Sequence, residues 1–182
     1  MGNIRLARDF FTRDILRVAP GLIGKTLVIR GVNGRITRYT ITETEAYRGY
    51  EDKACHACRG RTARTEVMYR EGGRIYVYFV YGMYWMLNFV AGKEGVPQAA
   101  LIRGIDGYDG PGKLTRALNI DGSFYGEDLA SSKRIWVEDP GMKPVIETGP
   151  RIGIDYAGEP WKSKKWRYSL TRPLKEKTSR SR

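Results

Sequence analysis

The chain has 182 residues, of which 41% are hydrophobic, and 32 Lys and Arg against 20 Asp and Glu give it a formal net charge of +12. This length suits one domain with a real core and is short for two, and the composition is globular. With no bilayer-length apolar run and no signal-peptide core, we expect no membrane partner and no secretion. The protein would lie in the cytoplasm or nucleoid of a prokaryote, or in a eukaryotic nucleus. The positive charge favours a polyanionic partner, most simply nucleic acid, although a solvated basic surface would give the same composition.

Hydrophobic spacing predicts an amphipathic helix over 12–22, with Thr12 as its N-cap and with Pro20 and Gly21 breaking it. Two strands are predicted next, over 25–30 and 35–47, joined by a turn at Asn33-Gly34.

The segment 49–73 is polar and predicts a loop. Two apolar strands follow over 75–90 and meet at a Tyr81-Gly82-Met83 turn. The remaining expected elements are a strand over 98–103, a helix starting near 113, mostly loop over 141–160 and a disordered basic tail over 175–182. Strands before few helices predict an α+β fold. We expect a single mixed domain over 1–174, built on a curved antiparallel sheet with surrounding helices and a protruding aromatic hairpin.

The cysteine and histidine content argues against a closed zinc site. Cys55 and Cys58 flank His56, the only histidine, so these residues offer three ligands where four are needed. Reduced thiols are the expected state of both cysteines. We therefore predict no metal and no cofactor.

The sharpest candidate site is the strand around Glu43, Glu45 and Tyr47, whose side chains share one face because side chains alternate along a strand. A carboxylate near DNA repels the phosphate backbone, so its presence needs a reason, such as activating a water or holding a metal. Ion pairing on an exposed face is the structural alternative.

Several residues outside this strand are further candidates. Asn88 is a polar side chain in an apolar strand, where it could satisfy buried groups or read a base edge. Arg103 ends the strand over 98–103 and could orient a water or simply terminate the strand at the surface. The 110–113 segment, Gly-Pro-Gly-Lys, could place backbone N–H groups against a phosphate. A bulky hairpin tip at Tyr81 suggests a wedge between bases, with a buried core hairpin as the alternative.

Taken together, these segments make the chain resemble the alkyladenine (3-methyladenine or methylpurine) DNA glycosylase family. The resemblance runs in order from about residue 10 to about 170. It is carried by Glu-Thr-Glu-Ala-Tyr at 43–47, Glu-Asp-Lys-Ala-Cys-His at 51–56, the run from Tyr76 to Tyr84 with Asn88, Leu-Ile-Arg at 101–103 and Gly-Pro-Gly-Lys-Leu at 110–114.

The resemblance implies an enzyme that flips alkylated or deaminated purines out of duplex DNA and hydrolyses the N-glycosidic bond, without strand nicking. It implies that Glu45 activates the water with help from Arg103. It assigns the base pocket to these residues: Tyr47, His56, Tyr78 and Asn88. It implies that Tyr81 fills the gap in the duplex from the minor groove, that Asn88 disfavours guanine, and that the protein acts as a monomer.

Four further positions are weaker candidates for DNA contact: Met83, Tyr84, Gly112 and Lys113. Two alternatives remain open on the residues alone. One is a metal-dependent nuclease using Glu43, Glu45 and Asp52. The other is a non-catalytic module whose tyrosines stack on bases.

Overall fold

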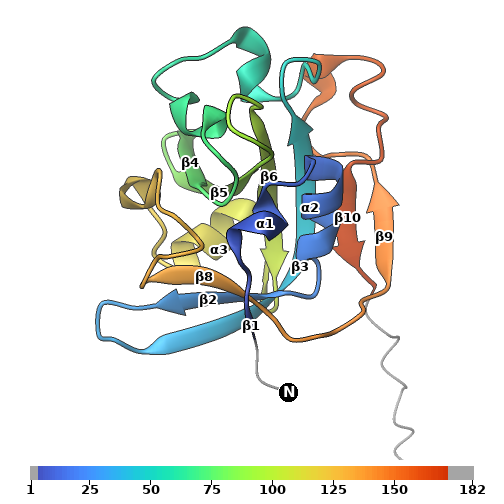
Figure 1. The fold of residues 1–182 in the computed structure, drawn as a ribbon. Helices are drawn as coiled ribbons and strands as arrows, with labels where there is room; N and C mark the ends of the chain where they lie inside the picture. Colours follow the sequence, from blue (N-terminus) through green and yellow to red (C-terminus); the bar gives the residue numbers. More distant parts are fainter. Residues whose placement is uncertain (1–3, 172–182) are drawn as a thin grey trace, which may run out of the picture.

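The architecture is that of a computed structural model, which describes residues 4–171 (Figure 1). Most of the described strands form one antiparallel path in the order β1-β8-β2-β3-β6-β5-β4; β10 pairs with β3 and β9, and β7 pairs with β6. The expected tail over 175–182 lies outside the described residues.

The strands are short at the edges of the sheet and long at its centre. Their bounds are β1 Ile4–Arg5, β2 Thr26–Arg30, β3 Ile36–Arg48, β4 Ile75–Val80, β5 Tyr84–Ala91, β6 Gln98–Ile105, β7 Tyr108–Asp109, β8 Ile135–Asp139, β9 Ile146–Gly149 and β10 Arg167–Leu170. The helices are few: α1 Arg8–Phe11, α2 Ile15–Leu22 and α3 Pro111–Ala117, with 3₁₀ turns η1 His56–Arg59, η2 Glu66–Tyr69, η3 Gly122–Phe124 and η4 Asp155–Ala157. The predicted α+β class with an antiparallel sheet is confirmed.

Strand β3 is central because it changes partner halfway along its length. Its first part pairs with β2, whereas 43–45 lie between β6 on one side and β10 on the other. One face of this second part packs on α2, where the Thr44 hydroxyl donates to the Ala19 carbonyl at 2.9 Å. Glu43, Glu45 and Tyr47 alternate with these core residues and therefore project from the opposite face.

The helix predicted over 12–22 is wrong in its details. Thr12 is the C-cap of α1, and the N-cap of α2 is Asp14, whose carboxylate accepts from the Leu16 N–H at 2.9 Å. Pro20 lies inside α2 and does not end it. The helix continues to Leu22 because that side chain is fully buried in the core, and burial outweighs the one hydrogen bond that proline removes.

The segment 141–160 is mostly loop, as predicted, and it also carries two short ordered elements. It contains β9 and η4, and β9 is joined to the body of the sheet by β10. Strands β10 and β3 are separated by more than 100 residues of sequence, so no local sequence pattern predicts that they pair.

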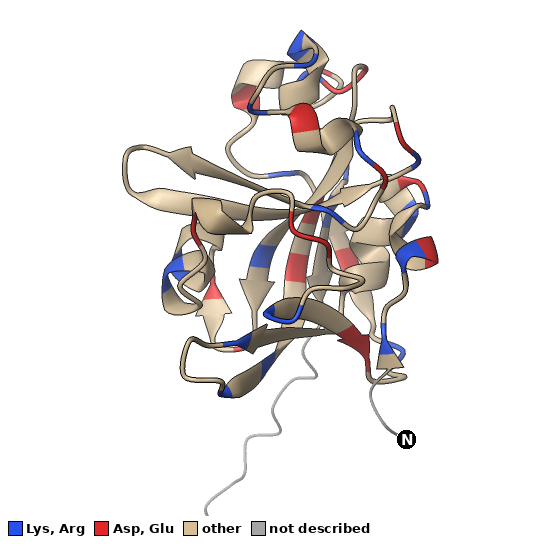
Figure 2. Cartoon of the chain, turned by 60° about the vertical axis from the view of Figure 1, so that its left-hand side comes forward, with Lys and Arg blue, Asp and Glu red and all other residues tan. Residues whose placement is uncertain are grey.

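The strands predicted over 75–90 pair as β4 and β5, with Val80 opposite Tyr84 and a turn at Tyr81-Gly82-Met83. The segment 75–91 carries no charged residue, so this strand pair is uniformly tan in the charge view (Figure 2). Its inner part enters the core, whereas Tyr81 is 87% exposed and Met83 64% exposed.

Candidate active site

A cavity of about 310 Å³ opens between β3, β4–β6 and the 152–156 segment. Its lining includes six of the sequence-predicted site residues, namely Tyr47, His56, Tyr78, Tyr81, Asn88 and Arg103. Aromatic walls with a few polar groups are typical of a pocket for a planar ligand.

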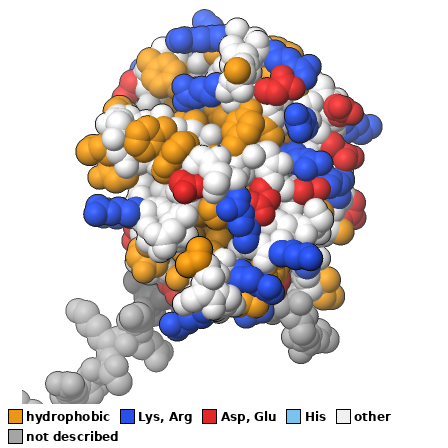
Figure 3. Space-filling model, turned by 90° about the vertical axis from the view of Figure 1, so that its left-hand side faces the viewer, with side chains coloured by type: hydrophobic (Ala, Val, Ile, Leu, Met, Phe, Trp, Pro, Cys, Tyr) orange, Lys and Arg blue, Asp and Glu red, His pale blue; other side chains and the backbone are white. Residues whose placement is uncertain are grey.

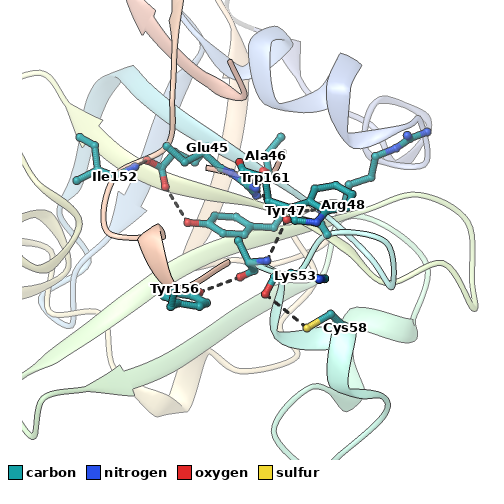
Figure 4. A network of polar contacts seen from close by, with 12 residues as sticks. Glu45, Ala46, Tyr47, Arg48, Lys53, Cys58, Ile152, Tyr156 and Trp161 are labelled. Carbon is teal, nitrogen blue, oxygen red and sulfur yellow. Dashed lines mark hydrogen bonds and ion pairs between the residues drawn. The ribbon is translucent and has the colours of Figure 1, made fainter. Parts of the chain in front are cut away.

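Glu45 lies directly behind the wall of this cavity and is fully buried. Its carboxylate accepts the Tyr47 hydroxyl at 2.8 Å and the Ile152 backbone N–H at 2.8 Å, as Figure 4 shows. Burial raises the pKa of Glu45, and the charge of Arg103 and these two hydrogen bonds offset part of that rise. A carboxylate desolvated in this way is a stronger base than one in water.

Arg103 reaches the same carboxylate from β6. The pairing of β3 with β6 is irregular here, since Glu43 lies opposite Gly104 and Thr44 opposite Ile102, which leaves Arg103 unpaired in a bulge. Bulges re-aim side chains next to active sites. The Arg103 Nε atom lies 3.5 Å from the nearer oxygen of Glu45 and has no hydrogen-bond partner among the described residues.

The Tyr47 ring is held from behind by a buried cation. The Arg151 guanidinium lies 4.8 Å from the ring centroid and forms a two-point ion pair with Asp52, at 2.5 and 2.8 Å. Both charged side chains are 0% exposed. This pair joins the turn after β3 to the segment that carries Ile152, so it fixes two walls of the pocket at once.

His56 and Tyr78 form another part of the cavity lining. Their rings meet edge to face with centroids 4.6 Å apart, and the His56 Nδ1 atom lies 2.8 Å from the Tyr76 hydroxyl. The Arg64 guanidinium lies 4.8 Å from the Tyr78 ring centroid and 3.5 Å from His56 Nε2. Burial, reinforced by the charges of Arg64 and Arg59, lowers the pKa of His56 to about 4, so the imidazole is neutral at pH 7.

This protonation state is directly measurable, because His56 is the only histidine. We expect its NMR resonance to titrate with a midpoint of about 4 in the folded protein, while the urea-unfolded chain titrates near the ordinary value of about 6.5. Folding stability should accordingly fall as pH drops from 6.5 towards 4, because only the unfolded state gains the proton. A folded-state midpoint near 6.5 would contradict this environment.

Asn88 lines the cavity, and its side-chain amide hydrogen-bonds to the backbone. Nδ2 donates to the carbonyls of Tyr76 at 3.1 Å and Met86 at 3.2 Å. These bonds show a structural role for Asn88, and its place in the cavity lining is compatible with base selection, which stays a prediction.

The weaker DNA-contact candidates lie around the β4–β5 turn. A Cβ placed on Gly112 would come within 2.8 Å of the Tyr84 ring, so a glycine is needed for α3 to pack against β5. Met83 and Lys113 are exposed. Hydrophobic side chains gather on the face that carries β4 and β5, with Lys and Arg side chains around them (Figure 3).

The alternative nuclease site does not assemble. Asp52 is committed to Arg151, and Glu43 is bound by Arg167 at 2.8 Å. Within residues 4–171 no three His, Cys, Asp or Glu side chains are grouped so that they could hold one metal ion. Cys55 and Cys58 are both free thiols.

Some site residues have no counterpart in the sequence-based prediction. Arg151, Ile152 and Tyr156 all come from the segment expected to be loop, and Tyr156 lines the cavity while donating to the Ala54 carbonyl at 3.2 Å. Periodicity carries no signal for them, because they act through a backbone N–H, a buried charge and a loop side chain.

The comparisons with known proteins show which family this chain belongs to. A family model described as methylpurine-DNA glycosylase matches residues 9–109 and 106–173. A relative from Methanocella arvoryzae is 44% identical over 86% of this chain and 90% of its own. One from Rickettsia felis is 44% identical over 92% and 94%, and one from Psychrobacter cryohalolentis is 42% identical over 87% of each. All three are named, provisionally, as 3-methyladenine DNA glycosylases.

None of the described helices combines the length and hydrophobicity needed to span a membrane.

Family and relatives together identify a DNA-binding repair enzyme. The chain therefore belongs to the methylpurine-DNA glycosylase family and is a hydrolase of N-glycosyl bonds of the DNA-3-methyladenine glycosylase type.

Proposed function

We propose that the protein flips a damaged purine out of duplex DNA into the 310 Å³ cavity and that Glu45 activates the water that cleaves the N-glycosidic bond. The observation that carries this proposal is the buried Glu45 carboxylate, held by Tyr47 and Ile152 directly beside an aromatic pocket. Tyr47 and Tyr78 would stack on the base, and tyrosine faces attract electron-poor alkylated purines. The neutral His56 suits such a base, because an imidazolium would repel a cationic one.

The chemistry requires Glu45 in its ionised form. Its raised pKa means that the rate falls with decreasing pH at a midpoint above the ordinary glutamate value of about 4.3. Because water is the nucleophile, no covalent intermediate forms on the protein and the DNA strand stays intact. We also propose that the duplex is approached from its minor groove and that the protein acts as a monomer.

The decisive experiment uses duplexes that each carry one defined lesion, among them 3-methyladenine, 7-methylguanine, hypoxanthine and ethenoadenine. We expect release of free base, intact strands before alkali treatment, and unchanged rates after exhaustive chelation. Binding without base release would favour the non-catalytic module. Activity that disappears with chelator and returns with magnesium would favour a metal-dependent enzyme.

Tyr81 provides a test of flipping. It has a positive φ of 53°, and Gly82 follows with 64°. A non-glycine residue there is strained by roughly 1–2 kcal/mol, so Tyr81→Gly should leave the melting temperature unchanged or higher. If Tyr81 fills the gap in the duplex, the same change should raise Kd for lesion DNA by more than for undamaged DNA. Equal weakening on both duplexes would reduce Tyr81 to an ordinary surface contact.

Asn88 provides a test of base selection. Asn88→Ser should increase release of guanine-type bases relative to hypoxanthine, because a shorter side chain leaves room at the purine 2-position. The lost bonds to the Tyr76 and Met86 carbonyls should also lower stability by roughly 1–3 kcal/mol. Matched guanine-type and hypoxanthine duplexes, measured beside a melting curve, separate the two effects. An unchanged rate ratio with a lowered melting temperature would leave Asn88 a purely structural role.

A further inference from the structure

Arg103 lies close to two carboxylates, those of Glu43 and Glu45. Its Nε atom lies 3.5 Å from an oxygen of Glu45 and 3.6 Å from an oxygen of Glu43, and it hydrogen-bonds to neither. The guanidinium is therefore shared nearly equally between two carboxylates that project from the same face of β3. A small movement towards either one would strengthen that contact and weaken the other.

Arg167 holds Glu43 in place on the far side. Its Nη1 atom lies 2.8 Å from the second Glu43 oxygen, and its Nε donates to the Pro150 carbonyl at 2.8 Å. In the strand register Arg167 lies opposite Glu45 and Ser169 lies opposite Glu43. Arg167 is therefore the diagonal neighbour of Glu43, within reach of a long side chain. Glu43 is thus anchored between two arginines, one on β6 and one on β10.

We propose that Glu43 and Arg167 are positioning residues that divide Arg103 between the two carboxylates and so set the pH at which Glu45 can accept a proton from water. This inference rests on Glu45 being the general base proposed above. Glu43 competes for the cation that most favours the ionised form of Glu45, and Arg167 limits that competition by satisfying Glu43 from the other side.

The charges around Glu45 make this balance sensitive. The titratable and charged groups that face it come from β3, β4, β6, β10 and the 151–152 segment: Glu43, Tyr47, Tyr78, Arg103, Arg151 and Arg167. Of these, Arg151 is fixed by Asp52 and Tyr47 donates a hydrogen bond. The Glu43–Arg103–Arg167 series can redistribute while the buried Asp52–Arg151 pair stays intact.

The test is the pH dependence of single-turnover base release, measured on one lesion duplex for all variants. In Glu43→Gln the competing charge is gone and Arg103 moves to Glu45, so the acid limb should shift to lower pH by about one unit or less. In Arg167→Gln, Arg103 is the one cation still paired with Glu43 among residues 4–171, so the acid limb should shift the opposite way. The double variant should follow Glu43→Gln, because Arg167 acts through Glu43.

Two controls separate an effect of the charges around Glu43 from a general effect of substitution. Glu127→Gln removes a carboxylate from an ion pair with Arg134 outside the cavity lining and should leave the profile unchanged. Arg167→Lys keeps the charge beside Glu43 and should restore the acid limb towards that of the unmodified protein. Melting curves show that each variant is folded.

Opposite shifts for Glu43→Gln and Arg167→Gln support the proposal when the double variant follows Glu43→Gln, because independent charge effects on Glu45 would offset each other in the double variant. A limb that stays in place in both folded variants, or moves the same way in both, overturns it while the hydrolase itself stands. Failure of the general-base role gives a different result, since Glu45→Gln would then retain its rate.

Discussion

Replacing Glu45 by Gln should reduce single-turnover base release by about 10²–10⁴-fold, the range expected when a general base is lost. The substitution keeps the size of the side chain and an oxygen for the Ile152 N–H. Binding to lesion DNA should therefore persist. Because the folded protein raises the pKa of Glu45 by burial, its ionised form opposes folding at neutral pH. The neutral variant should consequently melt at the same or a higher temperature.

The matched control is Glu147→Gln, which makes the same change on an exposed face of β9 and should alter neither rate nor stability. A Glu45→Gln variant that keeps more than half of the single-turnover rate would rule out the general-base role. A variant that loses both rate and lesion binding would point to a damaged pocket.

The largest effect on stability is expected at the Asp52–Arg151 pair. Asp52→Asn leaves the Arg151 guanidinium buried without its ion-pair partner, and breaking a buried pair in this way typically lowers the free energy of unfolding by about 3–5 kcal/mol. Catalysis should fall as well, because Arg151 precedes the Ile152 N–H that binds Glu45. Urea denaturation at pH 7 measures the first effect and single-turnover base release the second.

A second variant separates lost charge pairing from lost shape. Combining Asp52→Asn with Arg151→Met removes both charges, so much of the stability should return, and the oxygen of the introduced amide can still accept from a backbone N–H of Arg48 or Ala54. Arg61→Gln, at an exposed ion pair with Glu66, should leave the urea midpoint unchanged. If the double variant is no more stable than Asp52→Asn, the pair stabilises the fold by its packing and hydrogen bonds as well as by neutralising its own buried charges.

Much of the sheet could be predicted from local pattern, because alternation and turn residues act within a few positions. The strands around Glu45, Asn88 and Arg103 lie where the sequence predicts them, and the shared face of Glu45 and Tyr47 follows from strand geometry alone. The grouping of these residues around one cavity was expected from the family resemblance. What they do there stays a prediction.

The remainder depends on contacts between distant parts of the chain. Strand β10 has little hydrophobic alternation, and it is ordered by pairing with β3 and β9. Asp52 gives no local sign that its partner is Arg151, about 100 residues away. Pro20 shows the reverse case, in which a strong local signal is overruled by burial of the following turn. In each case tertiary packing decides what the local residues leave open.

The order of synthesis has a consequence for this site. Strand β3 emerges from the ribosome long before the groups that fix Glu45 and Glu43 from the other side, the Ile152 N–H and Arg167. A nascent chain ending before Ile146 can form much of the sheet and still lack one wall of the pocket and a partner strand of β3. If Glu45 is the general base that we propose, base release requires synthesis beyond β10 and should be absent from chains that end before that strand.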